Sequence, residues 1–362
     1  MSIETISFVT PLYFSERSYI GGGERYPINL AKAILMASPE NVRVEIVSFG
    51  PEAVQSRLDD RLEMRVLPAG ADNGNPLDSV SLDICDALDG ADLVHVHQAF
   101  TRSSQVSILA AKFLGATLCV TDHGGRTNHL DKVVDYLELA DLLVFYSEFA
   151  ATMIRSERPR RIIPGGVDTA WFAPPLRPRE RTHILFVGRL LPHKGVDRLI
   201  AAVPADIPLV VCGRPTNREY ADYLVAIARR RSVEFVHDAS DEEIRSLYQS
   251  AWATVLPSVH VDIWDNVYLY PELMGLTALE SMACGTPAIV STAGALSEFV
   301  QNGRTGHVFT ALSELGRICA DLASNPSESD RMGLAALVAV EERFSLPVVG
   351  KAFWQAYCAI PQ

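Results

Sequence analysis

The sequence predicts an α/β protein made of two Rossmann-like domains, each with a parallel sheet. At 362 residues the chain is too long for one ordinary hydrophobic core and has the length of two typical domains. Short apolar runs rich in β-branched residues alternate with segments of helical length, and this alternation occurs twice. A proline-rich segment separates the two sets. Together these observations give the fold class and the number of domains.

The first set of alternating segments predicts strands of one parallel sheet, connected by crossover helices. Its helices include residues 24–36 and 103–114. The expected strands of this first domain are residues 6–10, 42–48, 93–96, 118–121 and 142–146.

The second set repeats the alternation, with a helix at residues 221–231 among its connections. Residues 172–181, between the sets, contain three prolines and four charged residues with little apolar content, as linkers do. We therefore expect the boundary near Pro174, with domains at 1–173 and 174–345. The expected strands of the second domain are residues 184–187, 209–212, 233–236, 254–256 and 288–290.

The composition is that of a folded chain and excludes two classes of partner. Hydrophobic residues make up 48% of the chain and charged residues 21%, so there is ample apolar surface to bury. The net charge of −12 argues against nucleic acid as a partner, because phosphate backbones require basic patches. No run of about 18 apolar residues occurs, which argues against stable membrane insertion.

Localisation and thiol state are also expectations from the sequence. The N-terminus lacks the basic start and small-residue cleavage site of a signal peptide, so we expect a cytoplasmic location. The six cysteines form no Cys-x2-Cys pair and lie mostly in apolar runs. Reduced core thiols are therefore expected, and neither disulfides nor zinc ligands.

Two glutamates flank the start of a predicted helix in the segment 271–287. Glu272 precedes a glycine and so lies on a loop, whereas residues 275–284 have helical composition and contain Glu280. Gly285 ends this helix in the manner of a C-terminal glycine. One acid therefore lies before a helix N-terminus and the other lies inside the helix.

The same helix start predicts an anion site, because the backbone N–H groups of Gly275 and Leu276 lack partners and the helix dipole favours negative charge. About 80 residues upstream, an apolar strand ends at Gly188 and is followed by Arg189 and Lys194. Ligands of open α/β sheets bind at the carboxyl ends of strands, where these two cations can neutralise a diphosphate.

Five motifs in this order resemble those of one known family. They are Gly-Gly-Gly-Glu-Arg at 21–25, Pro-Gly-Gly-Val-Asp at 164–168, Gly-Arg-x4-Lys-Gly at 188–195, Glu-x7-Glu at 272–280 and Gly-Thr-Pro at 285–287. The chain thus resembles the family 4 retaining glycosyltransferases of GT-B fold, and the resemblance covers nearly its whole length.

The resemblance implies a fold, a reaction and a donor. Its two parallel sheets face across a cleft, and the C-terminal helix, here residues 346–362, crosses back to the first domain; a helix packed on its own domain is the alternative. The family transfers a sugar with retention of configuration from a nucleotide diphosphate sugar and uses no cofactor. For this chain we expect UDP or GDP as the nucleotide of the donor. The chain also lacks the Asp-x-Asp triplet of metal-dependent glycosyltransferases, so we expect no metal.

The resemblance also gives roles to residues of the second domain. Arg189 and Lys194 would stabilise the leaving diphosphate, on which negative charge builds during the reaction. Glu280 would hydrogen-bond the ribose hydroxyls of the nucleotide, and Glu272 would contact hydroxyls of the donor sugar. Surface charges are the alternative for all four, but the strand-end position and the flanking glycines favour the site.

In the first domain, candidates lie after two predicted strands. Gly22 and Gly23 follow the first strand and precede a helix, so their N–H groups could face a phosphate. Asp122 and His123 close another strand at the expected site, and His123 is similar to the family histidine that approaches the donor sugar. A capping aspartate and a loop histidine bonded to backbone are the alternative.

A pair of histidines in one strand has two possible uses. His95 and His97 share one face of their strand because side chains alternate with a period of two. This spacing suits metal chelation, but no further cluster of Cys or His joins the pair. His97, at the end of the strand, is instead a candidate contact for the acceptor.

One departure from the family pattern concerns the approach to Glu272. Leu273 and Met274 stand where an acidic or polar residue and phenylalanine are usual, and residues 259–271 form an apparent insertion that contains Trp264 and other aromatic residues. We expect this loop to shape the acceptor or donor-sugar site, because aromatic faces suit sugar rings. Packing of the loop against its own domain is the alternative.

The sequence therefore predicts a metal-independent retaining glycosyltransferase whose acceptor is a small soluble molecule with a hydroxyl group, secondary metabolites included. A nicotinamide-dependent oxidoreductase is the first alternative, but the Gly-x-Gly-x-x-Gly fingerprint is missing. The second alternative is a catalytically silent nucleotide-sugar binding partner, which would be expected to lose the cations or glutamates that are present here. The identity of the acceptor and the oligomeric state are left open.

Overall fold

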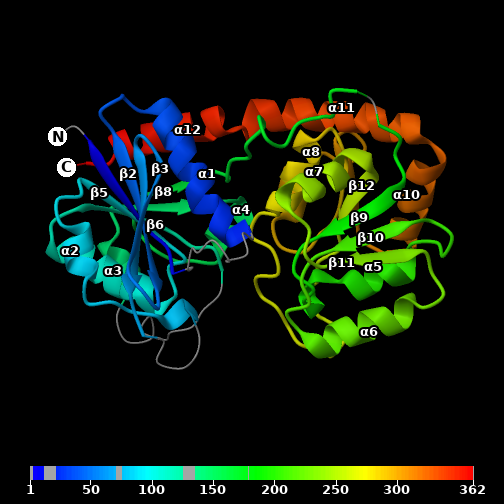
Figure 1. Cartoon of the computed structure of the whole chain (residues 1–362), viewed down its shortest axis with the longest axis horizontal. Coiled ribbons are helices and arrows are strands. Elements are labelled where there is room, and N and C mark those ends of the chain that lie inside the picture. Colours follow the sequence, from blue (N-terminus) through cyan, green and yellow to red (C-terminus); the bar gives the residue numbers. More distant parts are fainter. Residues whose placement is uncertain (1–2, 12–21, 71–75, 125–134, 178, 362) are drawn as a thin grey trace. The chain divides into compact units, whose positions relative to one another are not determined.

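The chain forms two compact units, Met1–Gly166 with Leu346–Gln362, and Val167–Ser345 (Figure 1). Each unit contains one predominantly parallel sheet with helices, which confirms the predicted α/β class with two Rossmann-like domains. The computed structural model describes residues 3–11, 22–70, 76–124, 135–177 and 179–361.

The first unit has an eight-stranded sheet in the order β3-β4-β2-β1-β5-β6-β7-β8. All neighbouring strands are parallel except β3 and β4, which form an antiparallel pair at one edge. The central strand β1 is buried from its second residue onward, since apolar side chains cover both faces of a parallel sheet. The strands are β1 (Thr5–Val9), β2 (Arg43–Gly50), β3 (Val54–Asp59), β4 (Leu62–Pro68), β5 (Leu93–His97), β6 (Thr117–Thr121), β7 (Leu142–Phe145) and β8 (Arg160–Ile162).

The helices of the first unit include the C-terminal helix of the chain, which packs beside the first helix (Figure 1). A Cβ added to Gly350 would lie 1.9 Å from the carbonyl oxygen of Ala33, so only glycine permits this close approach. The described helices are α1 (Gly22–Ala37), η1 (Pro76–Asp78), α2 (Ile84–Leu88), α3 (Arg102–Phe113), η3 (Tyr136–Leu139), α4 (Glu148–Thr152) and α12 (Leu346–Cys358).

The second unit has a six-stranded, wholly parallel sheet in the order β11-β10-β9-β12-β13-β14. Its core contains fully buried residues of the central strands, among them Ile184, Val211, Val255 and Ile289. The strands are β9 (His183–Val187), β10 (Leu209–Cys212), β11 (Val233–Val236), β12 (Ala251–Leu256), β13 (Ala288–Ser291) and β14 (Gly306–Phe309).

The helices of the second unit have clear local start and stop signals. α7 begins with a capping box, in which Ser240 and Glu243 each accept a hydrogen bond from the other's backbone N–H. α8 ends at Gly285, which has a φ of +76°. The helices are η4 (Pro192–Lys194), α5 (Val196–Ala202), α6 (Arg218–Ala228), α7 (Asp241–Ser250), α8 (Leu276–Ala283), α9 (Leu296–Phe299), α10 (Leu312–Ser324) and α11 (Pro326–Arg343).

The division between the units falls after Gly166, eight residues before the position near Pro174 that the sequence suggested. The intervening residues belong to the second unit because their aromatic side chains pack on α7. The ring of Phe172 lies edge-on to Tyr248, and Arg245 stacks over Trp171 at 4.3 Å. The segment of low apolar content after residue 172 is thus the exposed part of the connection between the units, which itself begins after Gly166.

Four strands were missing from the sequence prediction, for physical reasons that differ. β3 and β8 are exposed at nearly every position, so they carry no pattern of buried residues. β4 follows β3 directly and pairs with it antiparallel, outside the alternation of strand and helix. β14 has only four residues, two of them half-buried. The ten predicted strands are all present; two have the predicted boundaries and the others differ by at most three residues at either end.

The thiols and the helix lengths complete the description. All six cysteines are free; four are buried as expected for core thiols, whereas Cys85 and Cys358 are exposed. None of the helices in the described parts of the chain combines the length and the apolar character needed to cross a bilayer.

Close packing of α12 on α1 gives a prediction about stability. The Gly350→Ala variant is expected to lose about 1–3 kcal/mol of unfolding free energy, because its Cβ overlaps the Ala33 carbonyl and the helices must separate. Urea denaturation measures this. Gly70→Ala is the matched control, since a Cβ there meets nothing within 4 Å. Equal stability of the two variants would contradict the close approach of the helices.

Candidate active site

Lys194 is held at the carboxyl end of β9 by a tight turn. The chain leaves β9, passes through η4 and enters α5 at Gly195, which has a φ of +68°. A Cβ at this position would lie 2.1 Å from the carbonyl oxygen of Pro257, just after β12. Glycine therefore allows the turn that carries Lys194 to approach the end of the neighbouring strand.

Lys194 and Glu272 form an ion pair with 2.5 Å between Nζ and Oε1. Their side chains are only 17% and 13% exposed, so water screens this pair little. Ser258 Oγ donates a hydrogen bond to the same carboxylate oxygen at 3.0 Å. The structure thus brings together two of the predicted residues and adds a serine that the sequence analysis did not assign.

The backbone of Glu272 is fixed as closely as its side chain. Its carbonyl oxygen accepts a hydrogen bond from Ala295 N at 3.0 Å. Gly294, with a φ of +62°, passes so near that an added Cβ would lie 2.1 Å from this oxygen. The acid is therefore held between the ends of β12 and β13.

A second cation is available beside this pair. Arg189 is exposed, and its guanidinium makes no ion pair or hydrogen bond within the part of the chain that the structure describes. Burial lowers the pKa of His193 to about 4; the charges of Lys194 and Arg189 lower it as well, whereas the carboxylates of Glu272 and Asp262 oppose this shift. Because Glu272 pairs with Lys194, Arg189 is the cation whose charge remains to attract an anionic ligand.

The start of α8 has the geometry of an anion site. Gly275 caps the helix with a φ of +90°, and a Cβ there would lie 2.6 Å from a methyl carbon of Leu296. The N–H group of Ala278 already donates to the Gly275 carbonyl oxygen at 3.0 Å, whereas that of Leu276, at the first helical position, has no acceptor within the helix. The predicted donors at Gly275 and Leu276 lie three and four residues after Glu272 in the same segment.

Glu280 lies inside α8, as predicted, but it is 5% exposed and already bonded. Its Oε2 accepts a hydrogen bond from Tyr248 Oη at 3.1 Å. Tyr248, on α7, is fully buried, so it holds the carboxylate in one orientation. A carboxylate has about four lone-pair positions, which leaves acceptor capacity for further hydroxyl groups.

The loop 259–271, which the sequence suggested as an insertion, is organised around Asp262. This buried carboxylate accepts hydrogen bonds from the backbone N–H groups of Trp264 and Asn266, from the Asn266 amide and from Tyr268 Oη. The ring of Tyr268 lies 4.6 Å from that of His193, the residue before Lys194. The loop is thereby attached to the turn that carries the lysine.

Trp264, the predicted aromatic contact, packs edge-on against Tyr220 of α6 at 6.0 Å. Its side chain is partly exposed, as are those of Val261, Val267 and Leu269 in the same loop. Asp262, Tyr268 and part of the Trp264 side chain therefore make contacts within the second unit. For these residues the structure agrees with the alternative considered from the sequence, that the loop packs against its own unit.

In the first unit, three histidines meet where β5 and β6 end. His97 Nδ1 lies 3.1 Å from His123 Nε2, and the rings of His95 and His97 lie 4.3 Å apart. His95 bonds Tyr357 Oη at 2.6 Å and Thr121 Oγ1 at 2.7 Å, so both of its nitrogens are occupied. His97 has no exposed surface, so in this structure it meets His123 and not an acceptor directly.

The remaining candidates of this unit lie at the start of α1 and just beyond β6. Gly22 and Gly23 open α1, whereas Gly21 lies outside the described residues. Asp122 and His123 are both half-buried just beyond β6. Within the described ranges, no three side chains of His, Cys, Asp or Glu converge as ligands of a metal ion would.

Two family models match the chain. The model described as Glycosyltransferase Family 4 matches residues 20–171, and the model described as Glycosyl transferases group 1 matches residues 167–337. The chain belongs to the family 4 glycosyltransferases. Family membership leaves the nicotinamide-dependent oxidoreductase alternative without support.

Relatives and solved structures agree with this membership. Glycogen synthase of Mycobacterium tuberculosis is 33% identical over 213 residues, which are 55% of this chain and about half (48%) of that relative. Sucrose-phosphate synthase from Thermosynechococcus elongatus has 20% identity and a TM-score of 0.76, with 98% of both chains covered. Anabaena HepE, solved in complex with UDP and glucose, has 18% identity and a TM-score of 0.75 and covers 98% of this chain and 100% of its own. At such identities the structural similarity shows the fold, which is GT-B.

Sequence analysis of this family 4 member missed several residues that hold the candidates. Tyr248 and Ser258 bind the two glutamates, and Gln98 bonds the carbonyl oxygen of Gly124 next to His123 at 3.1 Å. Gln98 also has a φ of +60°, an uncommon conformation for a residue other than glycine. Only its place at the end of a buried strand could have drawn attention to it.

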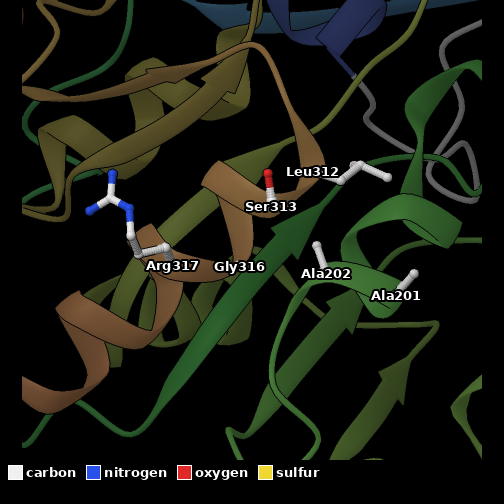
Figure 2. Close-up of a pocket in the computed structure, with 6 residues that line it drawn as sticks. All are labelled: Ala201, Ala202, Leu312, Ser313, Gly316 and Arg317. Atoms are coloured by element: carbon white, nitrogen blue, oxygen red, sulfur yellow. The ribbon is translucent and has the colours of Figure 1, made fainter.

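A pocket of about 410 Å³ in the second unit lies away from these residues (Figure 2). It lies between the C-terminal end of α5 and the first turns of α10, where Figure 2 shows Arg317 directed away from Ala201 and Ala202. Because α5 starts near Lys194 and runs back along the sheet, its far end is remote from the carboxyl ends of the strands. This pocket is therefore not the candidate site. Its lining residues are Ala201, Ala202, Leu312, Ser313, Gly316 and Arg317.

Buried histidines give a prediction about pH and stability. Burial, with a smaller effect of His123, lowers the pKa of His95 from 6.5 to about 3, so the folded chain keeps this ring neutral while the unfolded chain binds a proton below about pH 6.5. Unfolding free energy should therefore fall by about 1.4 kcal/mol between pH 7.5 and pH 5.5 on account of His95. Urea denaturation at both pH values checks this. The His95→Gln variant should show a smaller pH dependence, and an unchanged one would contradict the assignment.

Proposed function

We propose that this protein is a metal-independent, retaining glycosyltransferase that moves a sugar from a nucleotide diphosphate sugar to a small soluble acceptor with a hydroxyl group, such as a secondary metabolite. The observation that carries the proposal is the partly buried ion pair of Lys194 and Glu272, with Ser258 bonded to the same carboxylate, at the carboxyl ends of β9 and β12. Such strand ends are where ligands of open α/β sheets bind. Family membership supports the reaction type.

Arg189 and Lys194 stabilise the leaving diphosphate. Negative charge builds on the phosphate oxygen as the bond to the anomeric carbon breaks, and fixed cations near that oxygen lower the barrier. Lys194 has three N–H donors, so it can keep Glu272 and bind a phosphate oxygen at once. Glu272 in turn accepts hydrogen bonds from hydroxyls of the donor sugar.

The nucleotide lies along α8 in this proposal. The first-turn amides after Gly275 bind phosphate oxygens, and Glu280 accepts hydrogen bonds from the ribose hydroxyls. UDP is the first nucleotide to test because HepE, which shares the fold, was solved with UDP, and GDP is the next. Tyr248 keeps the Glu280 carboxylate oriented for the ribose.

Retention requires the acceptor oxygen to bond the anomeric carbon on the face from which the diphosphate leaves. The acceptor hydroxyl gives its proton to the leaving phosphate oxygen, so the charges balance without a separate protein base. Fixed cations take the role that a divalent metal has in other glycosyltransferases. The acidic charge of the first half of the chain, with 15 Lys and Arg against 23 Asp and Glu in residues 1–170, supports a neutral or cationic acceptor.

Lys194→Ala tests the leaving-group assignment. We expect turnover to fall about a hundredfold or more, by analogy with loss of one donor to a developing anion. Lys112→Ala is the matched control, because Lys112 forms a partly buried ion pair with Asp141 in the other unit. Release of UDP from UDP-glucose or UDP-galactose, or of GDP from the corresponding GDP sugars, gives the rate. Near wild-type turnover of Lys194→Ala would refute the assignment.

Thermal unfolding tests the donor site independently of the acceptor. UDP or GDP at about 100 times its Kd should raise the Tm by about 5 °C, also with EDTA present, because a ligand of the folded state stabilises it. The Glu280→Gln variant should lose most of this shift, whereas Glu328→Gln, whose carboxylate pairs with Arg331 of the same helix α11, should keep it. If no nucleotide shifts the wild type, the donor site is wrong; a shift without sugar transfer identifies a catalytically silent binding partner.

A further inference from the structure

The hydrogen bond between His97 and His123 fixes more than the position of the two rings. A neutral imidazole has one N–H donor and one lone-pair acceptor, so the nitrogen that holds the proton decides the direction of each hydrogen bond. Burial lowers the pKa of both rings, that of His123 to about 3, so both are neutral near pH 7. One of them therefore donates across the 3.1 Å between Nδ1 of His97 and Nε2 of His123.

The other nitrogen of His97 decides the direction. Among the residues that the structure describes, the buried Nε2 atom has no hydrogen-bond partner, while the ring is covered by Phe8, Tyr26 and His95. If the proton were on Nε2, a buried N–H would lack an acceptor, and such orphaned donors are rarer than unfilled acceptor positions. With the proton on Nδ1, only a lone pair is left unfilled.

We infer that His97 carries its proton on Nδ1 and donates a hydrogen bond from this N–H to Nε2 of His123. His123 must then hold its own proton on Nδ1. His95 cannot reverse this arrangement, because Tyr357 and Thr121 occupy both of its nitrogens. His97 is thus a positioning residue, because its hydrogen bond sets the tautomer of His123.

This tautomer determines what His123 can do for a substrate. Its Nδ1 has no hydrogen bond within the described residues, and the ring is half-buried. His123 therefore presents a fixed N–H donor to an oxygen of a bound sugar, and it has no free lone pair with which to act as a general base. The identity of this ligand rests on the proposed function, whereas the tautomer itself does not.

The surroundings hold the donor in one direction. Tyr26 and Tyr146 lie edge-on to the His123 ring at 4.7 Å and 5.1 Å. The Gln98 amide bonds the carbonyl oxygen of Gly124, which fixes the backbone directly after His123. Rotation of the imidazole would break its hydrogen bond to His97, so ring orientation and proton position are set together.

The tautomer can be measured directly, without substrate. Two-bond ¹H–¹⁵N correlation spectra of the full chain, labelled with ¹⁵N-histidine and recorded at pH 7.5, distinguish protonated from unprotonated ring nitrogens. His97→Asn and His123→Asn identify the two sets of signals by their loss. We expect protonated Nδ1 and unprotonated Nε2 on both residues. A proton on Nε2 of either ring would overturn the inference.

Two substitutions of His97 separate the donor from the ring. An asparagine amide can replace the Nδ1 donor, so His97→Asn should keep His123 protonated on Nδ1, whereas His97→Phe, which keeps a ring but no donor, should give a mixture of tautomers. Release of UDP from UDP-glucose should fall about 10- to 100-fold in His97→Phe and recover in His97→Asn, as for other supporting partners of a site residue.

Binding of UDP separates a failure of this inference from a failure of the proposed function. UDP is assigned to the second unit, so its Kd should be the same in both variants as in the wild type. Equal tautomer populations in His97→Phe and the wild type would overturn the positioning role of His97. If UDP binds none of the three proteins, the donor assignment fails, and the tautomer measurement still stands by itself.

Discussion

The ion pair between Lys194 and Glu272 constrains how the strand ends of the second unit are arranged. Two partly buried charges are costly unless they stay paired and hydrogen-bonded, so the surrounding chain must hold both in register. Ser258 supplies an additional hydrogen bond, and Gly195 and Gly294 let the backbone approach where a Cβ would not fit. The ends of β9, β12 and β13 are therefore arranged around one pair of side chains.

The inserted loop 259–271 adds a second support to the same place. Asp262 satisfies the donors within the loop, while Tyr268 packs on His193 and Val259 N donates to the His193 carbonyl oxygen at 2.8 Å. The insertion thus contacts the residue next to Lys194 and does not extend away as a free loop.

The two units bring different chemistry to the proposed reaction. The second unit presents charged groups, Arg189, Lys194 and the glutamates, whose charges suit a diphosphate and hydroxyl groups. The first unit presents neutral rings, because burial removes the charge from His95, His97 and His123. A neutral donor can recognise a sugar oxygen without adding positive charge near an anomeric carbon that itself becomes positive.

The sequence by itself determined the class of fold, the ten main strands and the segment from Glu272 to Gly285. These features are local: apolar runs form buried strands, and glycine at both ends of α8 sets where it starts and stops. The position of Arg189 and Lys194 just after a strand could also be predicted, because both follow an apolar run within one short segment. Such a prediction needs no information about the rest of the chain.

Only the tertiary structure decided which distant groups hold the candidates. Tyr248 meets Glu280 across 32 residues, His97 meets His123 across 26, and Tyr357 meets His95 across 262. Such contacts depend on strand order and on which helix returns to which sheet, and no pattern within a segment encodes these. The division between the units lies eight residues before the expected position near Pro174, because packing of Trp171 and Phe172 on α7 assigns these residues to the second unit. Local periodicity predicts elements, whereas side-chain hydrogen bonds across the fold follow from packing.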